Sequence, residues 1–168
     1  KSNNAQGEYY LTDVIGMAVQ AGLTIDTMQP AHGWEVDGVN DRVQLARLER
    51  IYQHVQAEAL MRAGVTVLDP TRLDVRGTVQ CGTDIVLDIN TVLIGEVTLG
   101  DRVSIGPNCV IRNASIAADT VIEANSVIDG AVVGAGCHVG PFARLRPGTQ
   151  LADRARIGNF VETKNARL

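Results

Sequence analysis

Aromatic residues are scarce in this sequence, at 4% of 168 residues, and cysteine occurs only three times. A core for a chain of this length must therefore come from aliphatic side chains, which fits the apolar content of 45%. No block of Lys and Arg occurs and the net charge is −4, so nothing favours a nucleic-acid partner. No apolar run approaches the roughly 18 residues that a membrane span needs, and no signal-peptide pattern is seen.

The three cysteines are far apart and show no zinc-binding spacing, so we expect reduced thiols and a cytoplasmic location. The chain opens with KSNNAQGEYYLTD, without Met, and ends abruptly with VETKNARL. We therefore expect a fragment of a longer protein.

A hydrophobic repeat fills the second half of the chain. From Leu87 the sequence divides into thirteen units that begin with Leu, Ile or Val, eleven of six residues and two of five: LDINTV, LIGEVT, LGDRVS, IGPNCV, IRNAS, IAADTV, IEANSV, IDGAV, VGAGCH, VGPFAR, LRPGTQ, LADRAR and IGNFVE. The fifth position is mostly small or β-branched, and glycine recurs at the second. A period of six matches neither a helix nor a simple alternating strand.

Short strands that turn every six residues predict a three-sided coil whose first positions point inward. In this interpretation the fifth position lies near a corner, and glycine at the second position relieves backbone strain in the turn. One coil cannot bury its own face, so neighbouring coils must stack on it. The pattern resembles the hexapeptide repeat of the left-handed parallel β-helix, and the resemblance supplies the handedness.

Before the repeat, Thr12–Gly22 predicts a short helix capped by Thr12, and residues 23–30 predict a strand. Residues 33–42 are rich in turn formers. A longer amphipathic helix is predicted over Asp41–Ala63, with Gly64 after its end. We expect a mainly β chain: residues 1–42 as the C-terminal remnant of an α/β nucleotidyltransferase domain, 43–63 as a linker helix, and 64–168 as the hexapeptide-repeat domain.

Two further motifs narrow the function. NNAQGEYYLTD with GVNDRVQLARLER, and VGPFARLRPG with IGNFVETKNARL, closely resemble the bacterial bifunctional N-acetylglucosamine-1-phosphate uridyltransferase and glucosamine-1-phosphate N-acetyltransferase family. The resemblance covers the whole chain, from the last part of the uridyltransferase domain into the acetyltransferase domain.

The resemblance implies two reactions and an assembly. An acetyl group moves from acetyl-CoA to glucosamine 1-phosphate, and the N-acetylglucosamine 1-phosphate formed attacks UTP to give UDP-N-acetylglucosamine. That product is a precursor of the cell wall and of lipopolysaccharide. The family is homotrimeric and uses Mg²⁺ in uridyl transfer.

The resemblance also implies roles for three residues. Asn40, in GVND, falls where the family holds Mg²⁺ and the nucleotide-sugar pyrophosphate; a turn residue is the alternative. Arg146 and Lys164 fall where the family binds the sugar phosphate in the acetyltransferase site. They are eighteen residues apart, which is three units or one coil, so they should stack on one face. The alternative is two solvated basic residues.

The family's catalytic histidine would lie beyond Leu168, so we expect no catalytic residue in this chain and no activity of the chain by itself. His138 does not match that histidine, and we interpret it as a surface residue. Arg144 closes its unit and is interpreted as a surface or inter-chain residue.

Two other functions remain open. One is a sugar-1-phosphate nucleotidyltransferase whose β-helix serves only assembly or regulation. The other is a non-enzymatic trimerising scaffold. The spacing of Arg146 and Lys164 argues against the first, and the GVND segment has no role in the second.

Overall fold

The structure, a computed structural model, describes residues 7 and 10–168. The chain forms two compact units, Lys1–Gly38 and Val39–Leu168. Most of the NNAQGEYYLTD segment, residues 3–6 and 8–9, lies outside the described residues. Within the described residues, no helix combines the length and apolar character that crossing a membrane requires.

The first unit contains helix α1 (Asp13–Gln20) and the short 3₁₀ helix η1 (Gly33–Val36). Gly22 has φ of 70°, as expected just after a helix end. The predicted cap at Thr12 is wrong, because Thr12 has helical φ and ψ and its side chain makes no capping bond. The predicted strand over residues 23–30 is also wrong: no described residue pairs with this segment, and a lone strand has no ladder to stabilise it.

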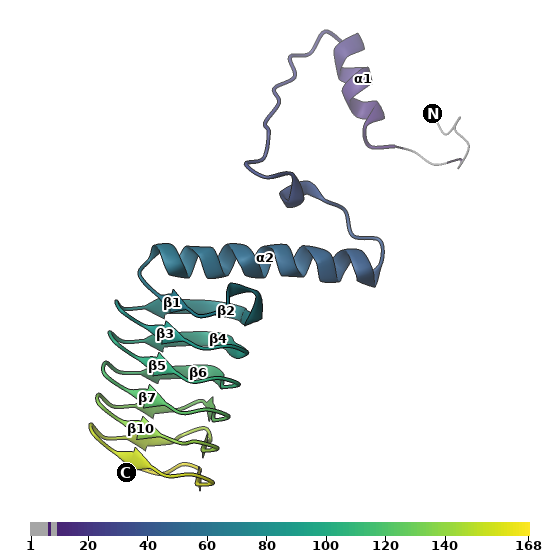
Figure 1. The fold of residues 1–168 in the computed structure, drawn as a ribbon. Helices are drawn as coiled ribbons and strands as arrows, with labels where there is room; N and C mark the ends of the chain where they lie inside the picture. Colours follow the sequence, from purple (N-terminus) through teal and green to yellow (C-terminus); the bar gives the residue numbers. More distant parts are fainter. Residues whose placement is uncertain (1–6, 8–9) are drawn as a thin grey trace. The chain divides into compact units, whose positions relative to one another are not determined.

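The predicted long helix is confirmed as α2 (Arg42–Arg62). Asp41 caps it by accepting a hydrogen bond from the Gln44 backbone N at 2.7 Å, and Gly64 follows its end with φ of 98°. Figure 1 shows α2 lying across the first coil of a stack of parallel strands.

The second unit is a parallel β-helix below α2. Its strands and one 3₁₀ turn are β1 (Thr66–Val67), η2 (Pro70–Arg72), β2 (Leu73–Cys81), β3 (Val86–Leu87), β4 (Thr91–Leu99), β5 (Ser104–Ile105), β6 (Val110–Ile116), β7 (Val121–Ile122), β8 (Val127–Asp129), β9 (Val132–Val133), β10 (His138–Val139), β11 (Arg144–Leu145), β12 (Gln150–Leu151), β13 (Arg156–Ile157) and β14 (Glu162–Thr163). Every pairing between these strands is parallel, so the predicted β-helix is confirmed; its left-handed sense stays a prediction.

The coils present three faces. The first face stacks β1, β3, β5, β7, β10 and β13. The second face stacks the opening residues of β2, β4 and β6 with β8, β11 and β14, and the third stacks their closing residues with β9 and β12. Equivalent residues on successive coils are therefore direct neighbours.

The interior follows the repeat. All thirteen first positions are buried with at most 6% exposure: Leu87, Leu93, Leu99, Ile105, Ile111, Ile116, Ile122, Ile128, Val133, Val139, Leu145, Leu151 and Ile157. Each such side chain contributes about 1.5–3 kcal/mol by leaving water. The fifth position is buried in the six-residue units up to Thr149, while in the last two units Ala155 is partly buried and Val161 is exposed. It is exposed in both five-residue units, at Ser115 and Val132, where Ala114 and Ala131 are buried instead. The missing residue leaves the buried small side chain two places before the next aliphatic one.

Glycine at the second position has, in most units, a different role from the predicted one. Of the second-position glycines, Gly140 has positive φ (101°), as predicted, but Gly100 and Gly134 do not; the left-handed residue is usually the fourth of its unit, as at Asn90 and Asn108. A Cβ on Gly100 would lie 2.5 Å from the backbone N of Ala118 on the next coil. Glycine is therefore required there by the close approach of the next coil, not by turn strain.

Candidate functional site

Arg146 and Lys164 are neighbours on the second face, as their spacing predicted. Strands β11 and β14 pair Arg144 with Glu162 and Leu145 with Thr163, and the Arg146 backbone N donates to the Thr163 carbonyl O at 2.9 Å. The next pair in register is Arg146 with Lys164. Leu145, between the two arginines, is fully buried, so the alternation along the strand turns both arginines outward.

Four charged side chains thus form one patch, which we call the charged quartet: Arg144, Arg146, Glu162 and Lys164. Arg146 Nη1 lies 3.1 Å from Glu162 Oε1, and Arg144 Nη1 lies 3.7 Å from the same oxygen. Lys164 is exposed and forms no ion pair with any described residue. Three cations and one carboxylate give the quartet a formal charge of +2, suited to a phosphate monoester dianion.

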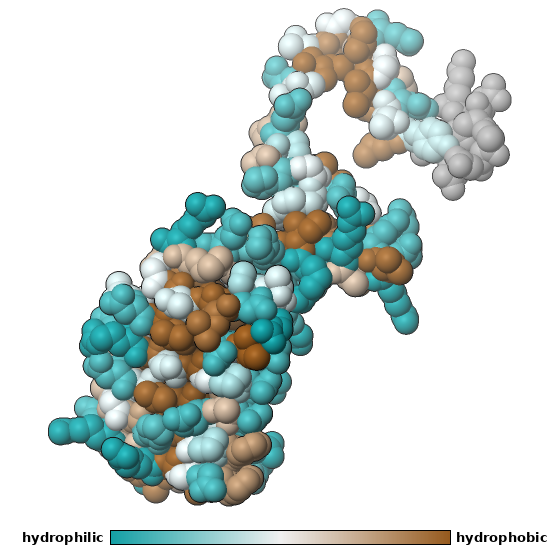
Figure 2. All heavy atoms as spheres, in the orientation of Figure 1, coloured by the Kyte–Doolittle hydropathy of each residue, from teal (hydrophilic) through white to brown (hydrophobic). Residues whose placement is uncertain are grey.

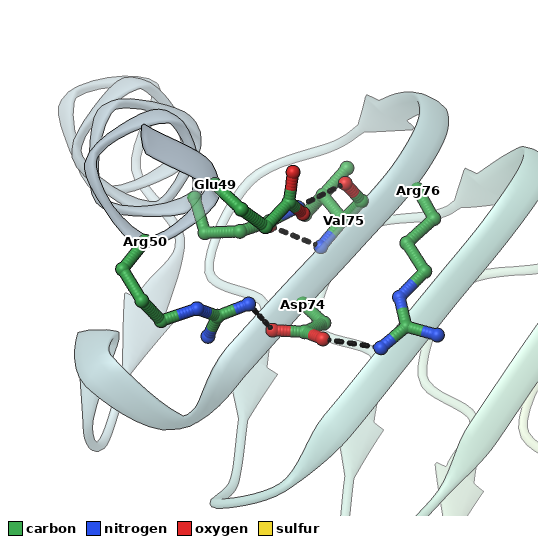
Figure 3. Close-up of polar contacts among 6 residues, drawn as sticks. Glu49, Arg50, Asp74, Val75 and Arg76 are labelled. Atoms are coloured by element: carbon green, nitrogen blue, oxygen red, sulfur yellow. Dashed lines mark hydrogen bonds and ion pairs between the residues drawn. The ribbon is translucent and has the colours of Figure 1, made fainter. Parts of the chain in front are cut away.

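A second cluster of two arginines and one carboxylate lies on the same face under α2, and Figure 3 shows it beside the helix. Arg50 Nη2 lies 2.7 Å from Asp74 Oδ1, and Arg76 Nη2 lies 2.6 Å from Asp74 Oδ2. Partial burial favours a raised pKa for Asp74, but hydrogen bonds from Arg76 and Arg50 outweigh it and hold the pKa below its ordinary value. This cluster joins the helix to the first coil.

Strand register places the two carboxylates in one column. Asp74 stacks on Val92, and the column continues through Val110, Val127 and Arg144 to Glu162. This column is therefore charged at both ends and apolar between them.

Gln53 on α2 completes the contact with the first coil. Its Nε2 donates to the Val75 carbonyl O at 2.8 Å, and its Oε1 accepts from the Val75 backbone N at 2.6 Å. Gln53 is 3% exposed and so substitutes for a neighbouring strand at the open edge of β2. Sequence reasoning missed it, because a glutamine on a helix gives no signal of a buried backbone partner.

The corner of each coil that precedes the second face changes from asparagine to phenylalanine in the coils that carry the quartet. Asparagine holds the left-handed position at Asn90, Asn108 and Asn125, and phenylalanine holds it at Phe142 and Phe160, with φ of 55° and 58°. A bulky residue is unusual in this conformation. The two phenylalanine rings stack with centroids 5.2 Å apart, and both are exposed. The aromatic corner and the charged quartet therefore lie on the same two coils.

His138 lies on the first face, away from the quartet. Its Nε2 is 3.1 Å from Glu123 Oε1, and its side chain is 45% exposed. This position is that of the surface residue that the sequence suggested, and Glu123 supplies an ion-pair partner that the sequence did not identify.

Asn40 lies directly before α2, at the other end of the β-helix from Arg146 and Lys164, so the structure does not bring these three predicted site residues together. Asn40 is exposed, and its backbone N donates to Gln44 Oε1 at 2.8 Å. Within the described part of the chain, no group of three or more His, Cys, Asp or Glu residues could hold a metal ion. A metal at Asn40 would need most of its ligands from elsewhere.

Comparison with known proteins gives two results. The family model described as GMPPB C-terminal domain matches residues 75–167, more than half of the chain. Proteins called "Bifunctional protein GlmU" match nearly all of it: the Alcanivorax borkumensis protein is 68% identical over 98% of this chain, the Burkholderia vietnamiensis protein 60% over 99%, and the Paraburkholderia xenovorans protein 58% over 100%.

The chain spans little more than a third of the length of these curated relatives, 36–37%. The resemblance inferred from the sequence motifs is confirmed over the whole chain. Since the family model covers the β-helix from Val75 to Arg167, the chain belongs to the GMPPB C-terminal domain family.

Proposed function

We propose that this chain is part of a bifunctional enzyme that makes UDP-N-acetylglucosamine. One site transfers an acetyl group from acetyl-CoA to glucosamine 1-phosphate. The other transfers a uridylyl group from UTP to N-acetylglucosamine 1-phosphate. Similarity along the whole chain to proteins called bifunctional supports this function. The observation that carries it is the stacking of Arg146 and Lys164 in a patch of net positive charge.

In the acetyltransferase site, Arg146 and Lys164 bind the phosphate of the sugar. The planar guanidinium of Arg146 offers two parallel N–H donors to phosphate oxygens, and the Lys164 ammonium adds a mobile point charge. Both side chains are outward and partly or fully exposed, so a ligand can reach them. The quartet holds the substrate; the proton acceptor for the attacking amine lies outside this chain.

For the domain organisation we propose residues 1–42 as the C-terminal part of the uridyltransferase domain, 43–63 as the linker helix, and 64–168 as part of the acetyltransferase domain. Helix α1 supports the first assignment, because it buries no side chain within the described chain. Its Val14, Ile15, Met17 and Val19 are more than half exposed, and Figure 2 shows apolar surface on this helix. Such a helix needs a larger domain to cover it.

In uridyl transfer, Mg²⁺ would neutralise phosphate charge. Asn40 would supply its amide oxygen to this ion, which suits a hard ion that takes few protein ligands, and its amide NH2 would donate to a pyrophosphate oxygen. The described residues provide no complete metal site. We further propose a homotrimer in the cytoplasm, without nucleic-acid partners, in which neighbouring subunits complete the acetyltransferase site.

The test follows thiol release from acetyl-CoA in the full-length enzyme with glucosamine 1-phosphate as acceptor. We expect release by the wild type and a loss of about 10²–10³-fold for Arg146→Ala, typical for removal of one charged contact in a preorganised site. A wild type that folds but releases no thiol would contradict acetyl transfer. It would instead favour a nucleotidyltransferase or a scaffold.

A further inference from the structure

Helix α2 begins with an unusual arrangement of its capping residues. Asp41 is the N-cap, and its side chain accepts a hydrogen bond from the Gln44 backbone N at 2.7 Å. In a capping box, the side chain at the position of Gln44 would bond back to the backbone N–H of the N-cap itself. Here Gln44 Oε1 instead accepts from the backbone N of Asn40, one residue earlier, at 2.8 Å. The helix thus uses this side chain to hold a residue that lies outside it.

The short helix η1 shows the ordinary arrangement in the same chain. His32 is its N-cap, and the His32 backbone N donates to Glu35 Oε1 at 3.1 Å, so the side chain three residues further on reaches the N-cap. The bond from Asn40 to Gln44 spans four residues instead of three. Completing a helix end needs only the shorter connection, and the longer one fixes Asn40 in place of the N-cap.

The position of Asn40 depends on this bond. Residues 37–40 form neither helix nor strand, and no described residue other than Gln44 forms a hydrogen bond with Asn40. Its side-chain amide therefore has no partner among the described residues. An asparagine that served only to stabilise a turn would bond to nearby backbone through this amide. The backbone of Asn40 is thus tied to α2, while its amide oxygen and NH2 are available to a ligand.

Gln44 can act as an anchor because α2 is itself held in place. Further along the helix, Gln53 bonds to both backbone groups of Val75 on the first coil, at 2.8 and 2.6 Å. A hydrogen bond from one side chain would fix little if the helix that carried it were mobile. The bond to Gln44 therefore ties Asn40 to a helix that is fixed on the β-helix.

We propose that Gln44 is a positioning residue of the uridyltransferase site, which holds Asn40 in place for binding Mg²⁺ and the pyrophosphate. This inference rests on the proposed function of Asn40 as a ligand of the ion, and it adds a residue that acts through Asn40. Partners that orient a metal ligand raise the affinity of a site because the ligand is fixed before the ion arrives. In this role Gln44 contacts neither the ion nor the substrate.

The experiment measures the dissociation constant of Mn²⁺ for the full-length enzyme with saturating UDP-N-acetylglucosamine, from the EPR signal of the free ion. Mn²⁺ suits the same oxygen ligands as Mg²⁺. Asn40→Ala should weaken Mn²⁺ binding because a ligand is lost. Gln44→Leu should weaken it by about tenfold, the lower end of the range for residues that orient a metal ligand.

A double-mutant cycle separates positioning from a general effect on the helix. If Gln44 acts through Asn40, Gln44→Leu should cause no further weakening in the Asn40→Ala background. Gln56→Leu is the matched control, because Gln56 also bonds through its side chain to a residue four positions earlier, the Tyr52 hydroxyl at 3.1 Å, but lies further along α2. It should leave the constant unchanged.

The outcomes distinguish the inference from the function on which it rests. The inference is overturned if Asn40→Ala weakens Mn²⁺ binding but Gln44→Leu leaves it unchanged. It is also overturned if Gln44→Leu weakens binding equally with and without Asn40, or no more than Gln56→Leu does. Unchanged Mn²⁺ binding in Asn40→Ala, or a wild type that binds no Mn²⁺, overturns the proposed role of Asn40 itself.

Discussion

The two ends of the second face carry the same combination of groups, two arginines on one carboxylate, in different surroundings. At the first coil, Asp74 is held by Arg50 from α2 and by Arg76 from β2. At the last coils, Glu162 is held by Arg144 from β11 and by Arg146, which directly follows β11, with longer contacts and a more exposed carboxylate.

The difference lies in what covers each cluster. Helix α2 packs on the first coil, so the charges there join two elements of the fold and their energy goes into stability. No described element covers the quartet, and an exposed ion pair adds little to stability. The same chemical groups therefore serve structure at one end and are available for binding at the other.

Gln53→Leu should have the largest effect on the contact between α2 and the first coil. The substitution removes both side-chain bonds to Val75 and leaves a buried backbone N–H and C=O unsatisfied, so we expect a loss of about 2–4 kcal/mol in the free energy of unfolding. Urea denaturation of the chain measures it. Gln56→Leu is the control, because the Gln56 side chain bonds to the exposed Tyr52 hydroxyl and not to a strand backbone within the described residues, and it should change stability far less. Equal effects of the two substitutions would show that Gln53 does not anchor the helix.

A matched pair of substitutions sharpens the comparison of the carboxylates. Asp74→Asn should lower the free energy of unfolding by about 1–2 kcal/mol, because two arginines lose a partly buried partner. Glu162→Gln should lower it by less than about 0.5 kcal/mol. The same urea titrations compare them. If Glu162→Gln costs as much as Asp74→Asn, the quartet is a structural cluster like the first.

The smallest expected effect is on how the stability contributed by Asp74 depends on pH. The pKa of Asp74 is lower in the folded chain than its ordinary value of 3.8, so the native state binds this proton less readily than the unfolded state. The stability it adds is present above its unfolded pKa and is lost as the pH falls through the folded pKa. The stability difference between wild type and Asp74→Asn should therefore be constant from pH 7 to about 5 and shrink below pH 4. A difference independent of pH would contradict the ion-pair explanation.

The sequence predicted the β-helix well because its determinant is local and periodic. An aliphatic residue every six positions identifies each inward side chain, and all thirteen are buried. The same regularity placed Arg146 beside Lys164, since a constant coil length fixes which residues stack.

Features that depend on partners outside the local pattern were not predicted. Residues 23–30 have the composition of a strand but pair with no described residue. The glycine at the second position was misinterpreted at Gly100, where it is required by the backbone of the next coil. Glu162 and Gln53 were missed because their roles come from contacts with Arg146 and Val75, which six-residue spacing does not single out. Whether Arg146, Lys164 and Asn40 bind ligands stays a prediction.

The central claim is that Arg146 binds the phosphate of the substrate, whereas Arg112, the equivalent arginine two coils earlier, does not. Arg112 and Arg146 occupy the same column two coils apart, and Arg112 pairs with Asp129 at 3.7 Å. The most direct measurement is kcat/KM for acetyl transfer to glucosamine 1-phosphate in Arg146→Ala and in Arg112→Ala of the full-length enzyme. We predict a loss of about 10²–10³-fold for Arg146→Ala and less than about threefold for Arg112→Ala. Equal losses, or full activity in Arg146→Ala, would contradict the claim.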